Sequence, residues 1–396
     1  MRGLLAAVMW AFFLGCSWTW VIGMFFPVLL VRDYGVWGWV AFAVPNVLGA
    51  VAMGFVLRDP ETSRRLVQRH GTACRWFSMV TLAYQAYLIS ALTGPVGLTV
   101  AGALMLGVLV AGRAEPLRDT FAAVLIFAVS IGLFAYAQST GQLWTHLDPA
   151  TFTPRLTTLD LYLFAPAAIF GFALCPYLDL TFHRTRQATQ PGTGKAAFTL
   201  GFGGVFFSMI VFSLGYAGAL ANATGHIGYD LAPRLWPVLV VQLVVQGGFT
   251  MAVHVRSLTI GSNRRAEFGL FITLAVGLML GLGVLLLDGE PGPWMRWTFV
   301  TSVTELGYRG FLLLYGTVFP AYVLLCMVPT YRQVSHKAKI GVFAIVATLS
   351  YPLACVAFIA NKSVWAVPIF AVVLVARVVI ELMPVKTRSD RVPLVD

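Results

Sequence analysis

The chain has 396 residues, of which 59% are hydrophobic and 11% are charged, and its formal net charge at pH 7 is +11. These fractions lie far outside the range of soluble globular domains, so lipid is expected to be the main solvent. They exclude a water-soluble fold. Nucleic acid is not an expected partner, because the positions of the basic residues explain the positive charge in another way.

Twelve apolar segments run through the chain, most of them close to the roughly 20 residues that cross a bilayer as a helix. They lie at 3–31, 36–57, 76–93, 96–112, 120–138, 161–180, 196–221, 235–255, 266–287, 307–328, 339–360 and 364–383. Continuous apolar runs predict an all-α polytopic protein of about 12 transmembrane helices. The gaps between them are too short for a soluble domain, so residues 1–396 are expected to form one membrane domain.

Basic residues between these segments fall mainly on alternate loops. Twenty of the 27 lysines and arginines lie on the side of the N-terminus, five lie on the opposite loops, and Arg309 and Arg377 lie inside helix ends. The positive-inside rule therefore places both termini in the cytoplasm, which an even number of spans requires. We expect a multi-pass protein of the bacterial inner membrane.

The chain carries no pattern typical of a metal centre. Its five cysteines are an odd number and form no Cys-x-x-Cys pair, and its six histidines form no His-x-x-x-His pair. No metal site and no cofactor are expected. The cysteines are Cys16, Cys74, Cys175, Cys326 and Cys355.

Two segments carry glycine where an apolar helix should continue. Residues 13–20 of the first segment read FLGCSWTW, and residues 169–177 of the sixth read IFGFALCPY, in which Pro176 removes a backbone donor. The two segments are five spans apart and run in opposite directions. Residues 1–138 and 160–330 are therefore predicted to form an inverted repeat of five plus five helices, followed by two more at 338–384. Secondary transporters place solutes at such interrupted helices. The alternative is that Gly15 and Gly171 only permit close packing.

This arrangement resembles the leucine-transporter fold of the amino-acid/polyamine/organocation superfamily over residues 1–330. Residues 15–18 (GCSW) and 43–49 (AVPNVLG) resemble, more specifically, the sodium:solute symporter family. The resemblance implies a secondary transporter that moves a small neutral or zwitterionic solute by alternating access. Sodium is the coupling ion that it suggests. The expected partners are the solute and the lipid bilayer.

The resemblance also implies which residues bind. A sodium ion would contact carbonyls near Cys16 and the hydroxyl of Thr250, although the family has two adjacent hydroxyl residues there and this chain has one. Solute would lie in a midplane cavity without buried charged side chains. The tyrosines could instead lie at the membrane interface, and the glutamines could pair between helices. The candidate solute-binding residues are Gly15, Ser17, Trp18, Tyr84, Gln85, Tyr87, Gly171, Phe172, Cys175, Gln242 and Gln246.

Two other functions fit the sequence. A membrane-embedded transferase could use Asp179, His183 and Arg184, since the spacing of the acid and the imidazole puts both on one helix face. A sensor or structural subunit that does not transport could share the transporter scaffold. For coupling to protons, His254 and Asp179, both near the cytoplasmic end, are the only candidates that could titrate, and the simpler interpretation is that each anchors a helix end.

Overall fold

The computed structural model describes residues 2–111, 116–144, 153–221, 235–259, 264–286, 300 and 302–383. Within these residues all regular structure is helical and no strand is present. Nine of the described helices are long and apolar enough to cross a membrane, and there are ten if the bent pair α1 (Arg2–Trp18) and α2 (Val21–Tyr34) forms one span. The predicted all-α membrane class is confirmed.

The first part of the chain contains α1, α2, α3 (Val36–Val56), α4 (Pro60–Ala111) and α5 (Pro116–Ser139). The helical geometry of α4 is interrupted at His70 and again at Gly94, where φ is +66°. Glycine adopts this left-handed conformation without a steric penalty. The second interruption divides the apolar part of α4 into two helices, at the boundary predicted between residues 93 and 96.

The sixth apolar segment consists of three pieces, which are α6 (Thr158–Leu174), a 3-10 turn η1 (Cys175–Leu178) and α7 (Leu180–Ala188). The next span is nearly continuous through a π-helical turn. It contains α8 (Pro191–Leu200), η2 (Gly201–Phe206) and α9 (Phe207–Ala221).

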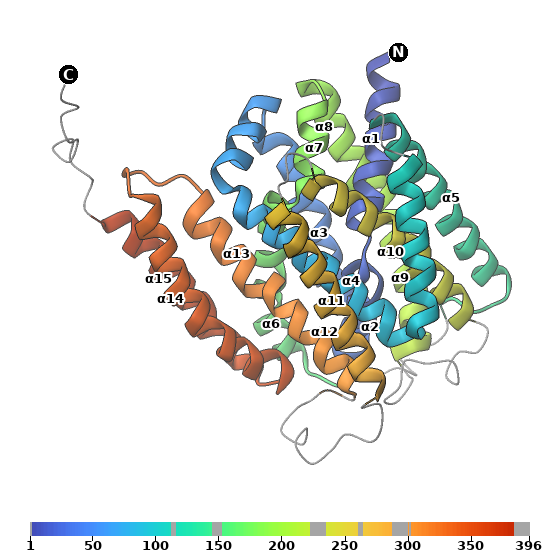
Figure 1. The fold of residues 1–396 in the computed structure, drawn as a ribbon. Coiled ribbons are helices and arrows are strands. Elements are labelled where there is room, and N and C mark those ends of the chain that lie inside the picture. The colour runs from blue at the N-terminus through green and yellow to red at the C-terminus, as the bar shows by residue number, and fades with distance from the viewer. Residues whose placement is uncertain are drawn as a thin grey trace.

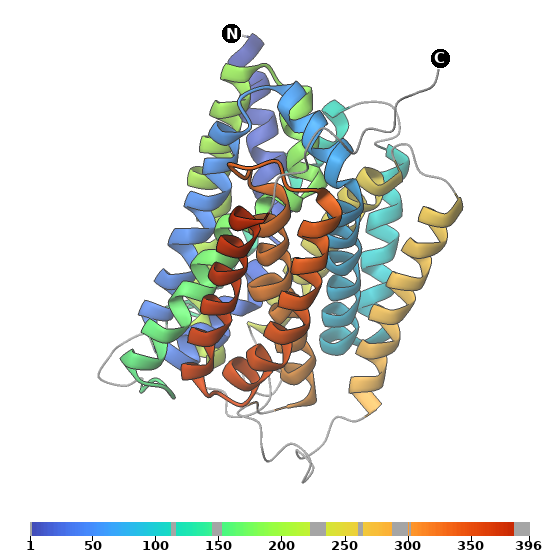
Figure 2. The same ribbon diagram turned by 90° about the vertical axis from the view of Figure 1, so that its left-hand side faces the viewer.

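Further spans complete the bundle. The first two are α10 (Trp236–Thr259) and α11 (Arg264–Leu286), and the next contains α12 (Val303–Leu313), η4 (Leu314–Val318), α13 (Phe319–Tyr322) and η5 (Val323–Met327). The last described elements are α14 (His336–Ala354), η6 (Cys355–Ile359), η7 (Ser363–Trp365) and α15 (Ala366–Leu382). In Figures 1 and 2, α14 and α15 lie side by side along one flank, where they contact α6, η4 and η5.

The bundle has two ends, which we call the N-terminal face, where α1 begins, and the opposite face. The chain runs from the N-terminal face through α1 and α2, whereas α6 and α7 lead back toward it (Figure 1). Helix α1 packs on α8, and α3 packs on α6. Helix α1 also packs on η2, where a methyl group added to Gly15 would lie 2.6 Å from Val205 Cγ1, so glycine permits the close approach.

Candidate functional site

Two interrupted helices define the centre of the molecule. Helices α1 and α2 meet at an angle of 58°, with Thr19 and Trp20 between them. In the sixth segment, η1 ends at Asp179, which joins it to α7 with an extended backbone. The first interruption lies within the predicted stretch 13–20, and the second extends two residues beyond the predicted stretch 169–177.

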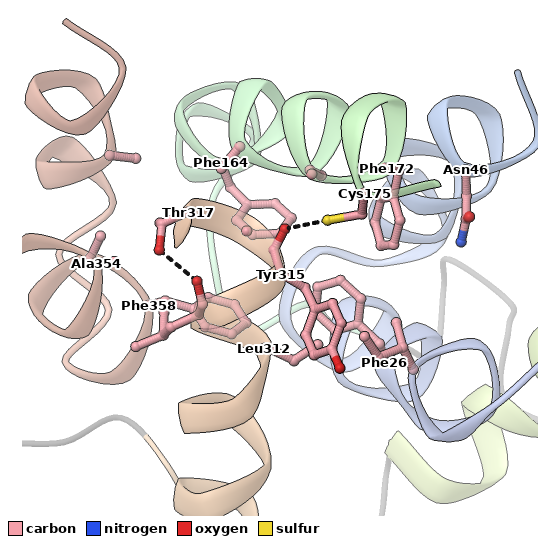
Figure 3. Close-up of a pocket in the computed structure, with 18 of the residues that line it drawn as sticks. Phe26, Asn46, Phe164, Phe172, Cys175, Leu312, Tyr315, Thr317, Ala354 and Phe358 are labelled. Atoms are coloured by element: carbon pink, nitrogen blue, oxygen red, sulfur yellow. Dashed lines mark hydrogen bonds between the residues drawn. The ribbon is translucent and has the colours of Figure 1, made fainter. Parts of the chain in front are cut away.

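A cavity of about 90 Å³ lies beside these interruptions, between α2, α6, η4 and the C-terminal helices (Figure 3). One water molecule needs roughly 10–15 Å³ on this measure, so the cavity has room for several non-hydrogen atoms. None of the described residues that line it is charged. Four candidate residues from the sequence are among them, namely Trp18, Gly171, Phe172 and Cys175.

The wall of this cavity is mainly apolar, with several aromatic rings. Some of its polar groups bond to the protein, whereas the Ser363 hydroxyl has no hydrogen-bond partner among the described residues. Trp18 Nε1 donates to Asn46 Oδ1 at 2.6 Å, and the Cys175 thiol donates to the Tyr315 carbonyl at 3.3 Å, as Figure 3 shows for the latter pair. The Thr317 hydroxyl donates to the Leu313 carbonyl at 2.6 Å. The remaining surface is apolar and suits the apolar part of a small molecule.

Other candidate residues join helices instead of lining this cavity. The Tyr84 hydroxyl donates to the Tyr308 carbonyl at 3.0 Å, and the Tyr87 hydroxyl donates to the Thr304 carbonyl at 2.8 Å. Both bonds hold α4 against α12. Gln242 donates from Nε2 to Ser130 Oγ at 2.9 Å, as the alternative of interhelical pairing predicts. Gly15 packs on η2, and Gln85 is buried with neither amide atom hydrogen-bonded to a described residue.

Gln246 lies between the two predicted sodium ligands. Its Nε2 atom donates to the Cys16 carbonyl at 2.5 Å and to Thr250 Oγ1 at 3.2 Å. The Cys16 carbonyl can only accept, which fixes the amide nitrogen on this side. An uncharged donor thus occupies the space between the two oxygens that the resemblance assigns to a cation. A sodium ion would have to displace it.

Ser17 connects the two interruptions. Its Oγ lies 3.2 Å from the hydroxyl of Thr181, on α7. The backbone N–H and the hydroxyl of Thr181 each donate to Asp179 Oδ1, both at 2.7 Å. Asp179 therefore caps the N-terminus of α7, where free N–H groups and the helix dipole stabilise a carboxylate.

Two ionisable side chains are buried outside the cavity, whose described lining is uncharged as expected. Asp179 and His254 are both fully buried, and their Oδ2 and Nε2 atoms lie 4.0 Å apart. His254 Nδ1 lies 3.2 Å from Ser78 Oγ on α4. The sequence suggested a helix-end anchor at residue 179, but the helix is broken there, so the residue starts a new helix inside the bundle.

The three residues of the transferase alternative do not converge. His183 Nδ1 lies 2.9 Å from Ser63 Oγ, and His183 Nε2 lies 2.9 Å from the Tyr177 carbonyl. Arg184 pairs at 2.6 Å with Asp119 on α5. The expected common face of Asp179 and His183 is therefore not used for a shared site.

A buried ionic cluster joins helices near the N-terminal face. Asp119, at the start of α5, pairs with Arg184 from α7 and with Arg256 from α10. Asp119 is fully buried, and the two arginine side chains are 16% and 12% exposed. We call these three residues the Asp119 network. One carboxylate serves two guanidinium groups there.

A second cluster joins α2 to α12 near the opposite face. Glu305 pairs with Arg32 at 2.6 Å and with Arg309 at 2.7 Å, and Arg309 also pairs with Asp33. We call these four residues the Glu305 network. The pairing of Glu305 with Arg309 follows from their i,i+4 spacing. The contact between Arg32 and Glu305 spans 273 residues, and no sequence pattern indicated it.

No protein-family model matches the chain, and no curated protein is significantly similar to it. The resemblance to the leucine-transporter fold thus depends on the order of the spans and on the short motifs given above.

Proposed function

We propose that this protein is a secondary transporter that moves a small neutral or zwitterionic solute by alternating access. The observation that carries the proposal is the position of the two interrupted helices. Both border one uncharged cavity, which lies between two faces that buried ionic networks hold together. Irregular backbone inside a membrane is tolerated where protein or a polar cavity satisfies it, and transporters use it to bind solutes.

The proposed architecture has twelve spans, of which the first ten form the inverted repeat of five plus five. The break of α4 at Gly94 and the bent pair of α1 and α2 support this division. Opposite directions of the two interrupted helices support the inversion (Figure 1). The packing is also reciprocal, because the first span contacts the seventh and the second contacts the sixth. We place the N-terminal face in the cytoplasm, because most basic residues belong to that side.

The proposed solute fits the chemistry of the wall. A cavity without charged side chains gives no counter-ion to a solute with a net charge, and burying an unpaired charge is costly. Aromatic rings such as those of Phe172 and Phe358 offer dispersion contacts to an apolar part. The hydroxyl of Ser363, which lines the cavity without a hydrogen-bond partner among the described residues, and the backbone at the two interruptions offer further hydrogen bonds. A neutral or zwitterionic solute with an apolar side suits this combination.

Coupling to sodium would require a cation site that the Gln246 side chain now occupies. The amide of Gln246 already bridges the Cys16 carbonyl and the Thr250 hydroxyl, so a cation at this point must first displace that amide. A hard cation also needs about six oxygen ligands. A weak sodium dependence, or none, is the expected behaviour of the unaltered protein.

Uptake by proteoliposomes tests the proposal. The full chain is reconstituted and offered a panel of radiolabelled neutral and zwitterionic amino acids, with protein-free vesicles as the blank. Ala357→Trp fills the cavity, whereas Val356→Trp places the same ring at the neighbouring residue, which does not line it. We expect Ala357→Trp to reduce uptake tenfold or more, equivalent to about 1.4 kcal/mol in binding. The control should retain uptake.

Two results would contradict the proposal. Equal loss of uptake in both tryptophan variants would remove the solute from this cavity. Binding of a panel member, measured as a thermal shift, without flux into vesicles would favour the sensor over the transporter.

A further inference from the structure

We propose that Asp179 and His254 together form a proton-binding site that couples proton movement to the two interrupted helices. This inference rests on the proposed transport function, and it assigns the coupling ion to a site that the solute cavity does not include. It is based first on two buried polar atoms, Asp179 Oδ2 and His254 Nε2, that have no hydrogen-bond partners among the described residues.

Asp179 Oδ2 and His254 Nε2 face each other at 4.0 Å, outside hydrogen-bond distance. Neither atom has a hydrogen-bond partner among the residues that the structure describes, and both side chains are fully buried. An unpaired buried polar atom costs about 1–3 kcal/mol. Two such atoms that point at one another can remove this cost by sharing one proton at a shorter distance. The distance between Asp179 Oδ2 and His254 Nε2 is therefore expected to shorten when the pair binds a proton.

The net charge of the Asp179–His254 pair also favours the binding of one proton. With an ionised Asp179 and a neutral His254 the pair carries one negative charge, and burial in a medium of low dielectric constant opposes net charge. Uptake of one proton brings the pair to net zero, either as an acid beside a neutral imidazole or as a carboxylate beside an imidazolium. The proton adds to Oδ2 or to Nε2, the two atoms without partners. It comes from water on one side of the membrane and returns to water on the other.

Among the described residues, the titratable neighbours that act electrostatically on Asp179 are uncharged in their ordinary forms. The Asp119 network is a charged cluster on the packed helices, and its charges already pair. These neighbours are Cys74 from α4, His183 from α7 and Tyr315 from η4, beside the network residues Asp119, Arg184 and Arg256.

Hydrogen bonds connect Asp179 to both interrupted helices. Asp179 holds Thr181 through two hydrogen bonds, and Thr181 lies 3.2 Å from Ser17, at the end of α1. The next residue, Trp18, lines the cavity, as does Cys175, four residues before the acid. A proton at Asp179 weakens its cap on α7, because a protonated carboxyl is a poorer acceptor than a carboxylate. Protonation of Asp179 therefore acts on the segments that carry Trp18 and Cys175, which line the cavity on two sides.

Infrared difference spectroscopy tests proton binding without any solute. The full chain in lipid is titrated from about pH 5 to about pH 8, the interval in which imidazoles normally titrate. We expect a carboxyl C=O band that grows as the pH falls, or histidine ring bands that titrate together with a carboxylate band. Asp179→Asn should remove this change. His254→Gln should shift its midpoint by one pH unit or more, and Asp179→Glu should restore a carboxyl signal if the asparagine variant fails to fold.

Asp160→Asn is the matched control, because Asp160 also stabilises the start of a helix in the sixth segment, as the N3 residue of the capping box of Thr157, and no imidazole among the described residues pairs with it. A titration that Asp160→Asn removes and Asp179→Asn preserves would overturn the inference. So would a spectrum without any change from Asp179 or His254 over the whole interval.

The outcome is independent of the solute. A titrating pair in a protein that transports no panel member would leave the proton site standing and contradict the proposed transport. Transport that ignores an imposed pH gradient, in a protein whose pair does not titrate, would contradict the proton site alone.

Discussion

The two ionic networks hold opposite faces of the bundle, but they differ in the number of acids. The Glu305 network has two carboxylates, which both contact Arg32 and Arg309, and Arg155 also lies 4.0 Å from Asp33. The Asp119 network has one carboxylate for two arginines from different helices. A network with two acids keeps one carboxylate beside Arg32 and Arg309 when the other is lost. We therefore expect the Asp119 network to be the more sensitive of the two to the loss of one carboxylate.

The largest effect is expected for Asp119→Asn. The change removes the buried carboxylate that pairs with Arg184 and Arg256, and breaking such a buried pair typically costs about 3–5 kcal/mol. Unfolding in mixed detergent micelles measures this loss. Asp160→Asn is the control, since the side-chain oxygen of asparagine can still accept the hydrogen bond from the Thr157 N–H in the capping box of α6. A loss for Asp119→Asn no larger than that of the control would show that the N-terminal face does not depend on this carboxylate.

Glu305→Gln should cost less, about 1.5–3 kcal/mol, because Asp33 remains close to both arginines. The same unfolding assay checks this. Combination with Arg32→Gln should then add little, since both changes remove one shared pair. A loss equal to that of Asp119→Asn would remove the difference between the faces on which the comparison depends.

A smaller effect is expected between the two faces, at Gln246. Gln246→Ala removes the amide that bridges Cys16 and Thr250, and leaves two oxygens free for a cation. Sodium at a few times its dissociation constant should then stabilise the variant by about 1 kcal/mol, and potassium should not. Thermal shifts measure both. Adding Thr250→Ala should abolish the response, and an equal sodium response in the unaltered protein would contradict this placement.

Much of the fold was predictable because hydropathy is a local signal. The described spans follow the apolar segments, and the i,i+4 pairs of Glu305 with Arg309 and of Arg377 with Glu381 were visible in the spacing. The cavity was only partly predictable. Trp18 and Phe172 line it, but the polar hydrogens of Tyr84 and Tyr87 are directed to backbone carbonyls of α12.

The rest depends on contacts that join distant parts of the chain. Asp179 was assigned to a helix end because its segment is apolar up to that residue, and nothing in the sequence placed it beside His254. Asp119 gave no signal of its own, since its two arginine partners come from the sixth and eighth spans. Charged residues that meet across the bundle cannot be paired from one sequence.

A transporter of the proposed kind opens its two faces in turn around the interrupted helices, and distances between pairs of spin labels measure this opening. One label pair joins Leu4 and Tyr331 at the N-terminal face, and the other joins Trp37 and Val364 at the opposite face, all at exposed residues. We expect Asp119→Asn to lengthen the first distance while the second stays short. Glu305→Gln combined with Asp33→Asn should reverse this pattern. Two distances that remain fixed, or that lengthen together in each variant, would contradict it.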